Sequence, residues 1–259
     1  MNILLDRSAR PVIGHRGAAA YAPENTLASF RRAVELGADA LEFDVRRAAD
    51  GVPVVHHDPT LDRTTDRAGP VASLTSAELA QVDAGYRFQG DGPEPGYRFR
   101  GAGVNVPTLR EVVLAFPATP LLIEIKEREV QDAVARVLVE CDAVDRAVVA
   151  GNDWRALAAF AGPPFNLGAS RRDIARLFFR WGRPDPACRC YAVPDRYYGL
   201  TVPSRRFVGA AARRASTVHV WTVDDAPSAL RLWQNGVNGI VTNRPEVILA
   251  ARTHAAPPR

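Results

Sequence analysis

The amino-acid sequence predicts a single (β/α)₈ barrel, and three observations support this fold class. The chain has 259 residues, close to the roughly 250 that are typical of such a barrel. Its composition, 47% hydrophobic and 24% charged, is that of an ordinary globular protein. Eight short apolar segments alternate with helical patterns almost from end to end, as expected for βα units in a parallel sheet. Eight such units favour a closed barrel, with a doubly wound open sheet as the alternative.

The expected strands and helices follow one another in a regular order. The short apolar runs that predict strands lie at residues 11–14, 40–46, 121–126, 147–151, 165–169, 189–193, 217–223 and 239–242. Between them, apolar residues at helical spacing predict helices. These helices lie at residues 24–36, 109–115, 129–141, 153–160, 171–180, 204–214, 227–235 and 245–252. The chain therefore alternates between strand and helix in all but one place.

The exception is the segment at about residues 59–107, which separates the second predicted strand from the third. It is far longer than the few residues usual for a βα loop. It contains one possible helix, capped at Thr75 or Ser76, and a Gly/Pro-rich stretch at residues 90–96. We expect an insertion over one mouth of the barrel, because too few strong apolar runs remain for a core of its own. Residues 1–259 are thus expected to form one domain.

Charge and cysteine content narrow the class of protein. The net charge of +4 would favour anionic partners, but the basic residues are scattered and predict no nucleic-acid-binding surface. Cys141, Cys188 and Cys190 form no disulfide or zinc-binding pattern and are expected to be free buried thiols. No apolar run approaches the ~20 residues of a membrane span. We expect a cytoplasmic protein without stable membrane insertion; the sequence does not indicate its oligomeric state.

The strand predicted at residues 40–46 places two carboxylates on one face. Side chains alternate along a strand, so Glu42 and Asp44 lie opposite Leu41 and Phe43. The two acids are only ~6–7 Å apart along the strand, and burying both would be unfavourable without compensation. A bound cation would supply that compensation. Alternatively, the acids are solvated on a surface strand.

The strand predicted at residues 121–126 repeats this pattern with Glu124 and Lys126. From adjacent strands, Glu42, Asp44 and Glu124 could chelate one divalent cation, and an all-oxygen set favours Mg²⁺ or Ca²⁺ over zinc. Lys126 is the only lysine of the chain, which suggests a position that arginine could not fill. It could hold a phosphate oxygen as a point charge. Alternatively, it neutralises the acids in a structural ion pair.

Three of the five histidines fall near these elements. His15 directly follows the first predicted strand, and His56 and His57 follow the short apolar run at residues 52–55. In a barrel, the loops after the strands build the active site, so a histidine there is a candidate acid or base. A lone histidine is more often structural, but histidines beside an acid cluster favour a catalytic role.

Short motifs run through the sequence from about residue 12 to residue 248. They are His15-Arg-Gly17, Pro23-Glu-Asn-Thr26, Glu42-Phe-Asp44, Asp50-Gly51, His57-Asp58, Leu61-Asp-Arg-Thr-Thr65, Pro107-Thr-Leu109, Ile123-Glu-Ile-Lys126, Val220-Trp-Thr222 and Gly239-Ile-Val-Thr-Asn-Arg-Pro245. In this order they resemble the glycerophosphodiester phosphodiesterase family. The sequence departs from the family at Asn238 and Asn243, where aspartates are usual, and at Gly151-Asn152, where Ser-Phe is usual. These departures leave the substrate preference open.

The resemblance implies a TIM barrel with a small insertion after the second strand. It also implies metal-dependent hydrolysis of small-molecule glycerophosphodiesters to glycerol 3-phosphate and an alcohol, with one Mg²⁺ or Ca²⁺. The residues that it assigns are Glu42, Asp44 and Glu124 to the metal, His15 and His57 to acid/base catalysis, and Arg16, Lys126 and Trp221 to the substrate. We predict His15 as the base and His57 as the acid; the nucleophile is either water or the glycerol 2-hydroxyl.

Two other functions are compatible with the sequence. A lysophospholipase D-like phosphodiesterase would need an apolar groove for an acyl chain, which residues 59–107 could form. A catalytically weak phosphate-binding barrel is also compatible, because a fold does not determine a function. The pair of His15 and His57 argues against this second alternative.

Overall fold

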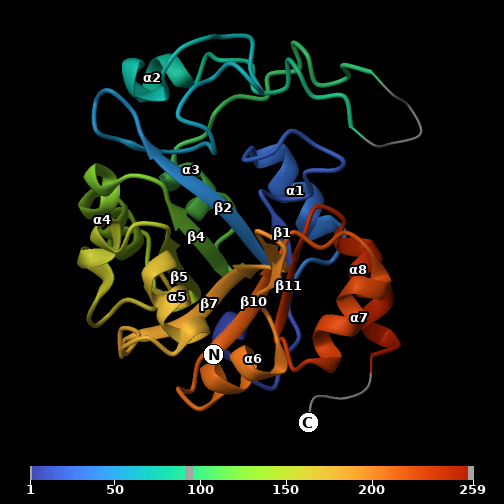
Figure 1. The fold of residues 1–259 in the computed structure, drawn as a ribbon. Helices are drawn as coiled ribbons and strands as arrows, with labels where there is room; N and C mark the ends of the chain where they lie inside the picture. Colours follow the sequence, from blue (N-terminus) through green and yellow to red (C-terminus); the bar gives the residue numbers. More distant parts are fainter. Residues whose placement is uncertain (1, 91–95, 256–259) are drawn as a thin grey trace.

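The structure is a computed structural model that describes residues 2–90 and 96–255, and it is a closed barrel (Figure 1). The parallel strands of the barrel are β1 (Val12–His15), β2 (Ala40–Arg47), β4 (Leu121–Ile125), β5 (Ala147–Gly151), β6 (Leu167–Gly168), β7 (Cys188–Pro194), β10 (Thr217–Trp221) and β11 (Gly239–Thr242). β1 pairs in parallel with both β2 and β11, and this pairing closes the sheet. The predicted barrel is therefore confirmed, and the open sheet is excluded.

Helices surround the strands, as Figure 1 shows. They are α1 (Leu27–Glu35), α3 (Leu109–Ala115), α4 (Gln131–Glu140), α5 (Arg171–Phe179), α6 (Arg205–Ala212), α7 (Ala226–Gln234) and α8 (Pro245–Thr253). Polar residues fix where several of them begin: the side chains of Thr26, Thr108 and Ser170 accept hydrogen bonds from backbone N–H groups of the first turn. The segment predicted as a helix at 153–160 is a 3₁₀ helix, Trp154–Phe160. Pro163 and Pro164 follow it and cannot continue a helix.

The interior of the barrel has an apolar layer at the end where the strands begin. Ile13, Leu122, Val148 and Val241 are buried there with Leu4, which belongs to the short 3₁₀ helix Ile3–Leu5. Because side chains two residues apart on a strand share a face, the residues that follow these point into the other end of the barrel. The site described below occupies that end, where the strands finish.

Residues 59–90 and 96–107 lie beyond the end of β2 (Figure 1). The strand β3 (Pro53–Val55) first pairs antiparallel with β2. The helix α2 (Ser76–Leu79) then begins after Thr75, whose side chain forms a capping box with Glu78, so the predicted helix is present. A small apolar cluster supports the segment and consists of Ala48, Val54, Leu61, Val71, Leu79, Val82, Ala84 and Val106. Most of the predicted Gly/Pro-rich stretch, residues 91–95, lies outside the described residues.

Two further features concern the rest of the chain. The hairpin of β8 (Arg196–Tyr197) and β9 (Leu200–Thr201) follows β7 and was not predicted from the sequence. All three cysteines are free thiols, as predicted, and Cys188 and Cys190 are buried, while Cys141 is only partly buried. Within residues 2–90 and 96–255, no helix combines the length and the hydropathy of a membrane-spanning segment.

Candidate active site

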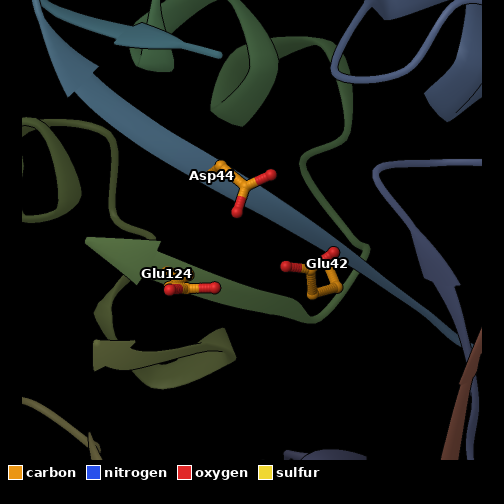
Figure 2. A group of neighbouring side chains, drawn as sticks. All are labelled: Glu42, Asp44 and Glu124. Atoms are coloured by element: carbon orange, nitrogen blue, oxygen red, sulfur yellow. The ribbon is translucent and has the colours of Figure 1, made fainter. Parts of the chain in front are cut away.

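Three carboxylates converge at the end of the barrel where the strands finish (Figure 2). Glu42 and Asp44 project from β2 and Glu124 from β4, and Asp44 and Glu124 are direct partners in the strand register. One oxygen from each of the three lies within 4.8 Å of the others. Asp44 is 1% exposed and Glu42 is 8% exposed. The solvated surface strand is therefore excluded, and the three acids form an oxygen cluster of the kind that hard cations prefer.

Two cations contact this acid cluster. The Lys126 ammonium lies 2.8 Å from Asp44 Oδ1 and 2.9 Å from Glu124 Oε2, and the Arg16 guanidinium Nε lies 3.2 Å from Asp44 Oδ2. Burial opposes the ionisation of Asp44, but the charges of Lys126 and Arg16 outweigh it and lower the pKa of Asp44 to about 2. Burial, followed by the charge of Asp44, raises the pKa of Glu42 well above its usual value. Ionisation of Glu42 is therefore unfavourable in this site, and a divalent cation would favour the ionised carboxylate.

Two asparagines that sequence reasoning left without a role hold the acids in place. Asn25 Nδ2 donates to Asp44 Oδ2 at 2.9 Å, and Asn25 Oδ1 accepts from the Asp44 amide at 3.2 Å. Asn152 Nδ2 donates to Glu124 Oε1 at 3.0 Å. Asn25 has a left-handed φ of 59°, a conformation that asparagine adopts more readily than most residues. An asparagine directly before the helix cap at Thr26 was therefore a signal in the sequence for this backbone conformation.

The turn after β1 positions His15 and Arg16. Gly17 has φ of 91°, and a Cβ atom there would lie 2.5 Å from the carbonyl carbon of Ser29 in α1. Only glycine permits this close approach of the turn to the helix. The tight turn also brings the Arg16 amide to within 3.0 Å of Glu42 Oε2. The His15-Arg16-Gly17 motif thus fixes a histidine and an arginine beside the acid cluster.

His15 is held by an asparagine at the end of β11. Its Nδ1 lies 2.8 Å from Asn243 Oδ1. The Asn243 amide is oriented by Asp224, which accepts from Asn243 Nδ2 at 2.8 Å and from the Asn243 backbone N–H at 2.7 Å. Because the amide oxygen can only accept, His15 Nδ1 carries the proton and Nε2 has a free lone pair. Burial, followed by the charge of Arg16, lowers the pKa of His15.

His57 has an ionised partner instead. Its Nδ1 lies 2.6 Å from Asp58 Oδ1, and Arg63 Nε donates to Asp58 Oδ2. Partial burial opposes the ionisation of Asp58, but the hydrogen bonds from Arg63 and His57 lower its pKa well below the usual range. Glu24 accepts hydrogen bonds from both Arg63 and Arg16, so a chain of alternating charges runs from Asp58 to Arg16. The neighbouring His56 is buried, and its Nε2 lies 3.1 Å from the Thr60 carbonyl oxygen.

One cavity of about 300 Å³ contains all the side chains that the sequence predicts for the site. They are His15, Arg16, Glu42, Asp44, His57, Glu124, Lys126 and Trp221. His56, the third candidate histidine, does not line the cavity. The contacts of Lys126 with two acids are compatible with both interpretations of this residue, the phosphate contact and the structural ion pair.

One side of the cavity is apolar, and the sequence did not predict it. We call this side the apolar wall, which consists of Ile174, Phe178, Phe179, Tyr197, Leu200 and Val202. The first three belong to α5, and the rest belong to or follow the β8–β9 hairpin. None of the lining residues comes from residues 59–90 or 96–107. The residues of this segment that the structure describes therefore do not contribute to this cavity, and several of their apolar side chains pack into the cluster described above.

Comparisons with known proteins show which sequences and folds this chain resembles. The sequence model of the glycerophosphoryl diester phosphodiesterase family matches residues 15–167. A glycerophosphodiester phosphodiesterase of Caldanaerobacter subterraneus subsp. tengcongensis is 30% identical over 252 residues, which cover 92% of this chain and 96% of the relative. The glycerophosphoryl diester phosphodiesterase domain of a Mycobacterium tuberculosis protein superposes with a TM-score of 0.79 at 22% identity, covering 95% of this chain and 99% of the domain. An Oleispira antarctica phosphodiesterase, solved with the product sn-glycerol-3-phosphate, has a TM-score of 0.76 at 25% identity, covering 95% of this chain and 97% of that one.

Proposed function

We propose that this chain hydrolyses glycerophosphodiesters to glycerol 3-phosphate and an alcohol, and that it uses one divalent cation. The chain belongs to the glycerophosphoryl diester phosphodiesterase family. The observation that supports this most strongly is the single cavity in which three carboxylates, two histidines and two basic side chains meet. The Oleispira antarctica phosphodiesterase of the same fold was solved with sn-glycerol-3-phosphate, which supports the proposed product.

The cation-binding residues in this proposal are Glu42, Asp44 and Glu124. Their oxygen-only donor set suits Mg²⁺ or Ca²⁺. When bound, such a cation would polarise a phosphoryl oxygen and stabilise the charge that develops on it. Arg16 and Lys126 would add positive charge on the same phosphate. Trp221, which is 42% exposed at the cavity, would form part of the substrate-binding surface.

The two histidines would divide the proton transfers between them. His15 presents a free Nε2 lone pair because its Nδ1 proton faces Asn243, so it is suited to accept a proton from the nucleophile. His57 faces the ionised Asp58, which would stabilise the imidazolium that donates a proton to the departing alkoxide. The nucleophile would be water, or the glycerol 2-hydroxyl through a cyclic phosphate.

Turnover of glycerophosphocholine and glycerophosphoethanolamine by the purified chain tests the proposal. We expect activity with Mg²⁺ or Ca²⁺, loss of activity in EDTA, and recovery when the cation is restored. Glu42→Gln should abolish most activity while the barrel stays folded, because it removes a charged ligand. Full activity after EDTA treatment and removal of bound metal would show that the cation is not required.

We further propose that residues 1–259 act as one domain with an insertion at about 59–107. The three free thiols suit a reducing compartment such as the cytoplasm. Limited proteolysis would test the first point, because a single domain should be cleaved in exposed loops without releasing a stable fragment of the barrel.

A further inference from the structure

The cavity has two chemically different sides. On one side, Arg16 and Lys126 supply positive charge beside the acid cluster. On the other side lies the apolar wall, and the one charged residue of α5 that also lines the cavity is Arg171, at the start of the helix. A small hydrophilic diester would fill only the charged side and would leave the wall in contact with water. A ligand that fits both sides has a phosphate at one end and an apolar chain at the other.

The apolar wall also continues to the protein surface. Phe179 is 65% exposed and Leu200 is 54% exposed, although both line the cavity. Four of the eleven large apolar side chains that are exposed among the described residues line this one cavity, and they are Phe179, Tyr197, Leu200 and Trp221. Exposed apolar side chains that gather in this way mark binding sites, whereas scattered ones do not. The apolar wall therefore extends from the cavity to the solvent.

We infer that the substrate carries one long apolar chain on its glycerol, as a lysoglycerophospholipid does, and that this chain lies along the apolar wall. The inference rests on the proposed function and specifies its substrate class. In the reaction, the oxygen of water bonds to phosphorus and the bond between phosphorus and the head-group oxygen breaks. The departing alcohol takes a proton, and the products are an acylglycerol phosphate and the free alcohol. The acyl ester is unchanged, and no oxidant or reductant is needed.

Steady-state kinetics with monomeric substrates of increasing chain length test this inference. The series comprises glycerophosphocholine and its 1-butanoyl, 1-hexanoyl and 1-octanoyl esters, each below its critical micelle concentration and with Mg²⁺ or Ca²⁺ present. Each methylene group that the wall removes from water should raise kcat/KM about twofold to fourfold. We therefore expect the octanoyl ester to be preferred over glycerophosphocholine by at least a hundredfold.

Variants of the apolar wall test whether the preference for longer chains depends on the wall or on exposed apolar side chains in general. Phe179→Ser and Leu200→Asp should each lower the ratio of kcat/KM for the octanoyl ester to kcat/KM for glycerophosphocholine by about tenfold, because burial of apolar surface is lost. Leu114→Ser is the matched control, since Leu114 is 58% exposed on α3, away from the cavity. It should leave both values unchanged. A fall in the ratio for the control as large as that for the wall variants would overturn the inference.

The outcomes separate this inference from the proposed function. If no diester is hydrolysed with either cation, the proposed function fails. If glycerophosphocholine is hydrolysed and acylation does not increase kcat/KM, the proposed function stands and the chain-binding wall is wrong. A rate that is independent of chain length but increases on addition of phosphatidylcholine vesicles would show that the wall faces a lipid surface, which also contradicts the inference.

Discussion

The two histidines in the cavity have the same side chain but opposite surroundings. His15 faces the neutral amide of Asn243, which is oriented by the carboxylate of Asp224. His57 faces the carboxylate of Asp58, which is paired with the guanidinium of Arg63. We call these two sets the His15 arm and the His57 arm. In each arm, the Nδ1 atom of the histidine is occupied and Nε2 is left for the substrate.

The difference between the arms shows how one residue type can serve two roles. A neutral acceptor fixes the His15 tautomer without stabilising a positive charge on the ring, and burial with the nearby Arg16 lowers its pKa. An ionised acceptor stabilises a positive charge on the ring it contacts. The His15 arm therefore suits a base and the His57 arm an acid. Exchanging the two acceptors should weaken this division.

The largest expected effect is the loss of either ring. His15→Ala and His57→Ala should each fold and lower kcat for glycerophosphocholine about 10²–10⁴-fold, the usual contribution of a general acid or base. A diester with a p-nitrophenol leaving group needs no proton on its departing oxygen. That substrate should largely restore His57→Ala and leave His15→Ala impaired, as measured by the release of p-nitrophenol.

Two outcomes would contradict this division. Equal rescue of both variants, or of neither, would show that the histidines do not have separate roles. If His57 only orients its loop through Asp58, His57→Ala should lower the melting temperature as strongly as the activity. Thermal unfolding of each variant beside its kinetics therefore serves as the control.

A smaller effect is expected when the acceptor of His15 changes. Asn243→Leu removes it and leaves the buried Nδ1–H unpaired, which costs about 1–3 kcal/mol and should lower kcat about tenfold to a hundredfold with little change in KM. Asn243→Asp would place a second carboxylate against Asp224, whose Oδ2 lies 2.8 Å from Asn243 Nδ2. Adding Asp224→Asn should relieve this repulsion and recover activity in the double variant. Equal activity of Asn243→Asp and the double variant would exclude the proposed contact.

The fold could be predicted from the sequence because its pattern repeats. Each of the predicted strands is present, since apolar runs bounded by polar residues are local signals. The β8–β9 hairpin was missed because its strands are only two residues long and carry no periodicity. The apolar cluster that supports residues 59–90 and 96–107 was also not predicted. Its members, such as Leu61 and Val106, are single residues far apart in the sequence.

Of the candidate site, the sequence could predict only those functional side chains that lie on strands or directly after them. Glu42, Asp44 and Glu124 alternate with apolar residues on paired strands, so their convergence follows from the strand register. Asn243 was noticed only as a departure from a family, because nothing local to it indicates a contact with His15, 228 residues away. The apolar wall was hidden for the same reason, because α5 and the β8–β9 hairpin meet only in three dimensions.

The smallest expected effect comes from making the His57 arm resemble the His15 arm. Asp58→Asn keeps an oxygen that can accept a hydrogen bond from His57 Nδ1 and removes only the negative charge. Both His57 and Arg63 are partly exposed to water. Water can therefore replace part of the lost stabilisation, and kcat for glycerophosphocholine should fall only about threefold to tenfold. Because the lost charge would act on protonation of the leaving group, the p-nitrophenyl diester should show almost no loss. Arg32→Gln, which alters an exposed ion pair with Glu35 on α1, is the control for charge removal alone. If Asp58→Asn slowed both substrates equally, the carboxylate would be needed for the folded site and not for the acid.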